Sequence, residues 1–109
     1  MTTATRIATA LTREIRRINA DLMDCIAEPS DSYWDRYGHP LADVFVRASD
    51  DGLRVTVCYD GAGYDYLSPC ADYPTVSDKY RARLDAVLRA IDPTLYLEDN
   101  NSWSASVWL

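Results

Sequence analysis

Two short runs of alternating apolar residues on either side of a turn constrain the fold of this chain most. The runs are DVFVRA at 43–48 and LRVTVCYD at 53–60, with Asp51-Gly52 between them. Because Asp-Gly favours a two-residue turn, they predict an antiparallel hairpin. Apolar residues then pair across one side of it: Val44 with Tyr59, Val46 with Val57, and Ala48 with Val55. The opposite side carries a mixed set suited to water or a partner: Phe45, Arg47, Arg54, Thr56 and Cys58.

Two amphipathic segments predict helices. The first covers residues 4–27, ends before Pro29, and has Thr2, Thr3 and Thr5 as candidate caps. Its apolar stripe recurs at spacings of three and four: Ile7, Leu11, Ile15, Ile18, Leu22 and Cys25 or Ile26. On its polar side, the spacing of Arg17 and Asp21 predicts an ion pair. The second helix is predicted to begin at Ser77 as its cap and to stop at Pro93. Its stripe consists of Tyr80, Leu84, Val87, Leu88 and Ile91.

The remaining segments predict three further strands. The sequence DGAG at 60–63 indicates a turn, because Gly61 and Gly63 tolerate a positive φ, and YDYL at 64–67 is predicted to return as a third strand. The tail at 94–109 predicts two strands about EDNNS, with Leu95, Leu97, Trp103, Ala105, Val107 and Leu109 on one side. We therefore expect a single α+β domain over residues 1–109. It has one antiparallel sheet of about five strands, in the order α-β-β-β-α-β-β, with two helices packed on one face.

The charge of the chain is unevenly distributed. The net charge is −6, but residues 1–20 carry four arginines against Glu14, which is a net +3. Residues 21–78 carry twelve acidic residues against three arginines, a net −9, and residues 79–109 balance at four against four. A chain with this balance is poorly suited to hold phosphate backbones, which need clustered Lys and Arg. A charged partner of this chain should instead be basic.

The cysteine and histidine content excludes the common metal and disulfide frameworks. Three cysteines, Cys25, Cys58 and Cys70, are an odd and sparse set, so we expect free thiols and a reducing cytoplasm. No Cys-x-x-Cys occurs and His39 is the only histidine. A zinc site would need these four residues to converge from separate elements, so we expect no metal. No run of apolar residues is long enough to span a membrane, and the N-terminus lacks the apolar stretch of a secretory signal.

The sequence contains no recognisable catalytic motif. It lacks a nucleophile elbow, a phosphate-binding Gly-x-x-x-x-Gly-Lys-Ser/Thr loop and a His-Glu-x-x-His pair. A dyad of Cys70 and His39, oriented by Asp35 or Asp72, is chemically competent but has no support from the spacing. We therefore expect no catalytic residues, no cofactor and no enzymatic activity.

Acidic and aromatic residues alternate between positions 31 and 73, largely in predicted turns and loops. A carboxylate can bind a guanidinium while an adjacent ring offers its negative face, and recognition surfaces are enriched in tyrosine. The predicted partner-binding residues are Tyr33, Trp34, Asp35, Tyr37, Asp60, Tyr64, Asp65, Tyr66, Asp72 and Tyr73. The alternative is that several rings belong to the core, first of all Tyr59, Tyr64 and Tyr66.

Two classes of function follow from these features. The first is an inhibitor that covers the basic nucleic-acid site of a partner by imitating DNA, as phage anti-defence (anti-CRISPR) or immunity proteins do. The second is a self-associating assembly or chaperone-like module that uses the N-terminal helix stripe or the edge of a terminal strand. We favour the first, with a basic protein surface as partner and no direct nucleic-acid or membrane contact, and leave a homodimer open.

Overall fold

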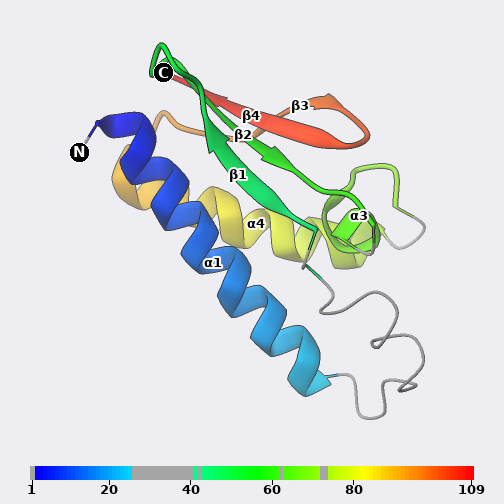
Figure 1. Cartoon of the computed structure of the whole chain (residues 1–109). Coiled ribbons are helices and arrows are strands. Elements are labelled where there is room, and N and C mark those ends of the chain that lie inside the picture. The colour runs from blue at the N-terminus through cyan, green and yellow to red at the C-terminus, as the bar shows by residue number, and fades with distance from the viewer. Residues whose placement is uncertain (1, 26–40, 42, 62, 72–73) are drawn as a thin grey trace.

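The computed structural model describes residues 2–25, 41, 43–61, 63–71 and 74–109. Its helices are α1 (Thr3–Cys25), α3 (Gly63–Leu67) and α4 (Pro74–Ile91). Its strands are β1 (Phe45–Ala48), β2 (Arg54–Cys58), β3 (Glu98–Asn101) and β4 (Ser104–Trp108), which form one antiparallel sheet in the order β1-β2-β4-β3 (Figure 1). The α+β class is confirmed, with four strands where about five were expected.

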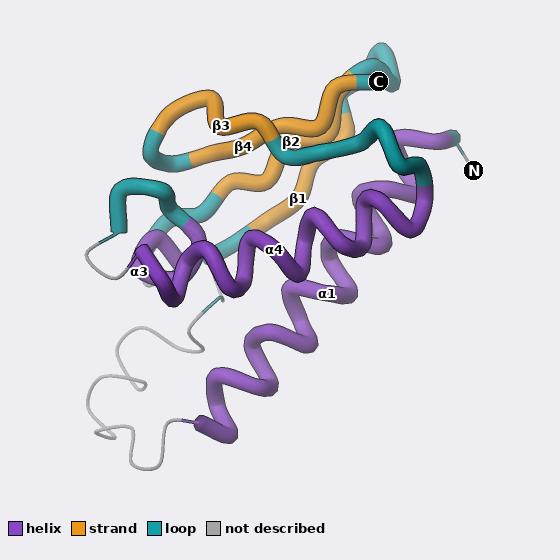
Figure 2. The backbone as a smooth tube through the Cα atoms, turned by 180° about the vertical axis from the view of Figure 1, so that it is seen from behind, coloured by secondary structure: helices purple, strands orange, loops and turns teal. Residues whose placement is uncertain are grey.

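Helices α1 and α4 lie on one face of the sheet and cross each other beneath it (Figure 2). The predicted α1 stripe is buried from Ile7 to Leu22, and α4 contributes Tyr80, Leu84 and Leu88 to the same core. Val55, Val57, Ala105 and Val107 supply the sheet side of this core. No helix of the described residues is both long and apolar enough to cross a membrane.

The β1–β2 hairpin has the register that the sequence predicts. Val46 pairs with Val57 and Ala48 with Val55. The turn is wider than the predicted two residues, because the Ser49 N–H donates to the Arg54 carbonyl at 2.8 Å and closes a loop over 50–53. Gly52 has a φ of 71° in this loop. The Ser49 hydroxyl and the Leu53 N–H both donate to the Asp51 carboxylate, which lowers the pKa of Asp51.

The segment YDYL does not form the predicted third strand. It belongs to the short helix α3, where the Ser68 N–H donates to the Tyr64 carbonyl at 3.0 Å. Strand β2 is paired with β1 on one side and with β4 on the other, so it offers no edge to a strand that follows it. Gly61 has the positive φ expected of the turn, 55°, whereas Gly63 does not. The glycine at 63 is instead required by close packing against Val44 and Tyr59.

The C-terminal hairpin is displaced from its predicted position. β3 consists of the EDNN residues predicted as a loop, while Leu95 and Leu97 lie buried before the strand. The Leu97 N–H donates to Asp85 on α4 at 3.1 Å, which holds this approach segment against the helix. The register shifts between Asp99 and Asn101, so the predicted alternation does not hold through the turn. Ala105 and Val107 are buried as predicted, whereas Trp103 in the turn and Leu109 after the end of β4 are 52% and 41% exposed.

Helix ends and surface pairs also differ in part from the sequence prediction. Thr2 caps α1, since its hydroxyl accepts the Thr5 N–H at 3.2 Å. α4 begins at Pro74, a residue type that suits a first helical turn, and Ser77 is buried within it instead of capping it.

Arg17 pairs with Glu14 at 3.3 Å, and Asp21 pairs with Arg83 at 2.6 Å, in place of the predicted pair between Arg17 and Asp21. Arg83 also binds Glu14 at 2.9 Å and so ties α4 to α1.

Replacing Gly63 with alanine is expected to lower the free energy of unfolding by about 1–3 kcal/mol, because the new Cβ would overlap the stiff Val44 side chain. Gly52→Ala is the matched control. Gly52 has open space around it, so alanine there should lower the free energy of unfolding by only about 1 kcal/mol, through the backbone strain of a positive φ. Urea unfolding of both variants measures the difference, and equal losses would contradict close packing at residue 63.

Candidate functional site

Asp60, Tyr64 and Asp65, three of the predicted binding residues, lie at the α3 end of the molecule. Asp60 follows β2 and Asp65 lies on α3, and both side chains are exposed. Asp60 accepts the N–H of Gly61 at 2.8 Å. α3 itself lies beside the first turns of α4, at the end of the sheet where the β3–β4 turn also lies (Figure 1). We call the surface formed by Asp43, Asp60, Tyr64, Asp65 and Trp103 the acidic end.

The two tyrosines of α3 serve different purposes. Tyr64 packs against Trp103 of the β3–β4 turn, with ring centroids 4.7 Å apart, and is half-buried. Tyr66 packs against Tyr80, which is buried in α4, with centroids 6.4 Å apart. Tyr64 is therefore available to a partner together with Trp103, whereas Tyr66 packs against the core.

Six of the ten predicted binding residues lie outside the described residues: Tyr33, Trp34, Asp35, Tyr37, Asp72 and Tyr73. The same holds for His39, so the dyad considered with Cys70 is not described either. The structure thus brings together Asp60, Tyr64 and Asp65 and assigns Tyr66 largely to packing.

Two residues of the acidic end were not among the predicted ones. Asp43 precedes β1 and lies beside Gly61, where a Cβ would be 2.6 Å from its carboxylate. The sequence could have predicted the position of Asp43, because extending the hairpin register by two residues beyond Phe45 and Cys58 places Asp43 opposite Asp60. Trp103 reaches the acidic end because the Tyr59 N–H donates to its carbonyl at 2.9 Å. Only the tertiary pairing of β4 with β2 reveals this contact.

The face of the sheet opposite the helices carries a second exposed group. Phe45 and Trp108 are both more than half exposed, and the Arg54 guanidinium lies 5.3 Å from the Trp108 ring centroid. Phe45, Arg54 and their neighbours Arg47, Thr56 and Cys58 line a shallow cavity of about 390 Å³. The prediction of a mixed surface here is confirmed, and Trp108 is the addition that the structure makes to it.

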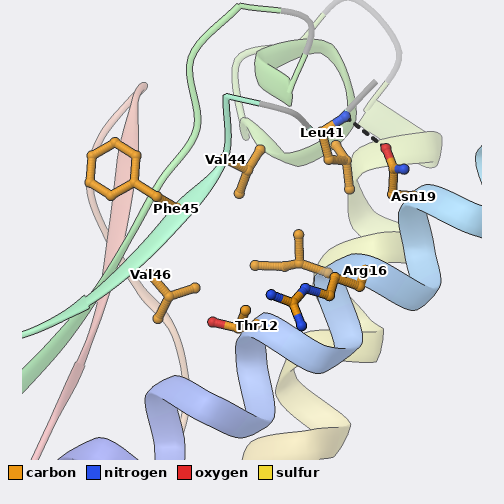
Figure 3. Close-up of a pocket in the computed structure, with 8 residues that line it drawn as sticks. Thr12, Arg16, Asn19, Leu41, Val44, Phe45 and Val46 are labelled. Carbon is orange, nitrogen blue, oxygen red and sulfur yellow. Dashed lines mark hydrogen bonds between the residues drawn. The ribbon is translucent and has the colours of Figure 1, made fainter. Parts of the chain in front are cut away.

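A groove runs between α1 and the edge strand β1 (Figure 3). Val44 and Val46 point from β1 toward α1, while Thr12 and Arg16 extend from the helix toward the strand. The Leu41 N–H donates to the Asn19 side chain at 3.0 Å and closes one end. This cavity of about 310 Å³ shares Thr12 and Arg16 with a second one of about 380 Å³ farther along α1 toward Thr5.

A partly buried polar cluster lies where the end of β2, β3 and α4 meet. Arg81 donates to Asp99 at 2.7 Å and to the Leu67 carbonyl at 3.3 Å. The Tyr59 hydroxyl and the Arg81 Nε have no hydrogen-bond partner among the described residues. Burial raises the pKa of Tyr59 to about 12. The positive charge of Arg81 opposes this rise, while the negative charge of Asp99 adds to it.

The potential metal ligands of the described residues do not form a cluster. Cys58 is half-buried and Cys70 is exposed, and both thiols are free. Within the described part of the chain, no three His, Cys, Asp or Glu side chains lie close enough together to hold a metal ion. Comparisons of the chain with protein-family models, curated proteins and solved structures give no match.

Proposed function

We propose that this chain is a non-enzymatic cytoplasmic protein-binding module whose acidic end docks on a basic surface of a partner protein. The observation that carries the proposal is that Asp43, Asp60 and Asp65 take part in none of the ion pairs formed among the described residues. All three are exposed, and they lie at the same end of the molecule as the half-buried Tyr64 ring and the exposed Trp103 ring that packs against it.

This combination suits a guanidinium-rich surface. Carboxylates form charge-assisted, often bidentate bonds to arginine, and the neighbouring rings add cation–π attraction and contact area. Basic surfaces of this kind are typical of proteins that hold phosphate backbones, so the partner class we favour is a nucleic-acid-binding protein, which this module would block. In this role the chain would act as a DNA mimic, and an anti-CRISPR or related anti-defence protein is one form of it.

The alternative, self-association through the N-terminal helix stripe, has less support. The stripe residues of α1 from Ile7 to Leu22 are buried in the chain's own core. An assembly role would therefore need a strand edge.

Changing Asp43, Asp60 and Asp65 together to asparagine is expected to slow association with the partner about tenfold or more at low salt, because complementary charge mainly accelerates encounter. Partners are captured from the native host at low ionic strength, identified, and then measured by surface plasmon resonance over a salt series. Wild-type binding should weaken steeply with salt, and the triple variant should show a smaller salt slope.

A matched control removes three charges elsewhere. Asp24, Asp50 and Asp92 are exposed and take part in no ion pair of the described structure, so Asp24→Asn, Asp50→Asn and Asp92→Asn give the same net charge. If both triple variants lose the same amount, net charge and not the acidic end controls binding. Wild-type binding that persists in molar salt would also refute the proposal.

A further inference from the structure

We propose that the groove between α1 and β1 receives an extended acidic segment of a partner protein, which adds to the sheet as a strand beside β1. This interaction is separate from the acidic end and does not depend on the function proposed above. It rests on the backbone of the edge strand, the shape of the groove and the charge of its helix side.

The outer edge of β1 offers backbone groups for pairing. β1 is the first strand of the sheet order, so β2 is its sole neighbour in the described sheet. The Ser49 N–H donates to the Arg54 carbonyl across the hairpin, and bonded pairs alternate along an antiparallel ladder. Arg47 and Phe45 therefore also direct their backbone groups toward β2, whereas those of Val46 and Ala48 point away from it. An incoming strand would find two donors and two acceptors there.

The groove lies on the side where the alternate side chains of such a strand would enter. Val44, Val46 and Ala48 face the helices but remain half-exposed, because α1 does not cover them fully. Together with Ile15 and Ala8 they give the two joined cavities an apolar floor. Apolar side chains of an added strand can therefore be buried at every second position.

The helix side of the groove is basic. Arg13 and Arg16 line it, both are exposed, and neither takes part in an ion pair of the described residues. An acidic segment would place carboxylates within reach of these guanidinium groups. The strand partner should therefore carry both apolar residues and at least one Asp or Glu at the alternate positions that face the groove.

A second copy of the chain fits this groove less well. Its own β1 has Arg47 and no acid, so self-pairing would bring like charges together. Its other edge strand, β3, is acidic, but it is interrupted by a bulge and its Asp99 is already paired with Arg81.

The test is selection of displayed random peptides on the purified full-length protein, with affinities of selected peptides measured by fluorescence anisotropy. We expect enrichment of peptides of about six residues, the typical length of a strand, in which one set of alternate positions carries apolar residues together with at least one Asp or Glu. Val46→Pro removes an outward N–H without touching the ladder to β2, and Arg16→Glu reverses a groove charge. Each should weaken binding about tenfold or more. Arg89→Glu, an exposed charge reversal on α4, should leave binding unchanged.

Circular dichroism and thermal unfolding check that each variant is folded. Should Val46→Pro fail that check, the selected peptide is N-methylated at alternate amides. Methylation in one phase should abolish binding to the wild-type protein, and methylation in the other should not. The proposal is overturned by any of four results: no enriched peptides, peptides insensitive to these changes, competition by a single-stranded oligonucleotide in place of acidic peptides, or a wild-type dimer that Val46→Pro dissociates.

Discussion

Replacement of Leu11 by alanine is expected to lower the free energy of unfolding by about 2–5 kcal/mol. Leu11 is fully buried in the middle of α1, and α1 packs on α4, β1 and β2. The loss combines the transfer free energy of the removed methyl groups with the cavity that remains. Urea or thermal unfolding measures it.

Leu53→Ala is the matched control for this change. Leu53 is 57% exposed at the hairpin loop, so the same truncation should change stability by no more than about 0.5 kcal/mol. The comparison also tests the role of the α1 stripe. If the stripe served self-association, the effect of Leu11→Ala would grow with protein concentration. We expect the same loss over a hundredfold range of concentration.

Alkaline solution should destabilise the protein through Tyr59. Its pKa is raised by burial from the ordinary value of about 10 to about 12. Above pH ~10 the unfolded chain loses the phenolic proton while the folded protein keeps it, so unfolding becomes easier as the pH rises. The contribution is fully present below pH ~10 and falls by about 1.4 kcal/mol per pH unit until pH ~12, a total of about 2–3 kcal/mol.

Tyr59→Phe isolates this effect from other alkaline titrations. The stability of the wild type relative to the variant should be constant up to pH ~10 and then decline toward pH ~12. Since the hydroxyl has no hydrogen-bond partner among the described residues, the variant should be as stable as the wild type at pH ~7, or more stable by about 1 kcal/mol. A difference that stays flat across the alkaline range would contradict the burial of this hydroxyl.

The two errors in the predicted strands have a similar cause. The intrinsic β-propensity of YDYL predicts a strand, because tyrosine favours strands. Whether a strand forms there depends on a free neighbour, and β4 occupies that position after a separation of about fifty residues along the chain. The shift of β3 has a similar origin, since Leu95 and Leu97 are held against α4 before the strand begins.

The acidic end shows how far sequence could predict a site. The register alone would have placed Asp43 opposite Asp60, but no local pattern connects Trp103 with Tyr64 across 39 positions. The groove was not foreseen for the same reason. Its two walls, α1 and β1, are each predictable, yet their separation depends on how the helix crosses the sheet.

What the sequence determined by itself was the set of surfaces that must be buried. The three- and four-residue spacing of the α1 stripe and the two-residue alternation about Asp51-Gly52 specify buried faces through local geometry, whatever the rest of the chain does. Tertiary structure decided which strand became the neighbour of β2, which ring Tyr64 contacts, and which strand edge was left open. These outcomes depend on competition between distant segments for the same hydrogen-bonding edge and the same apolar face, and local spacing contains no information about that competition.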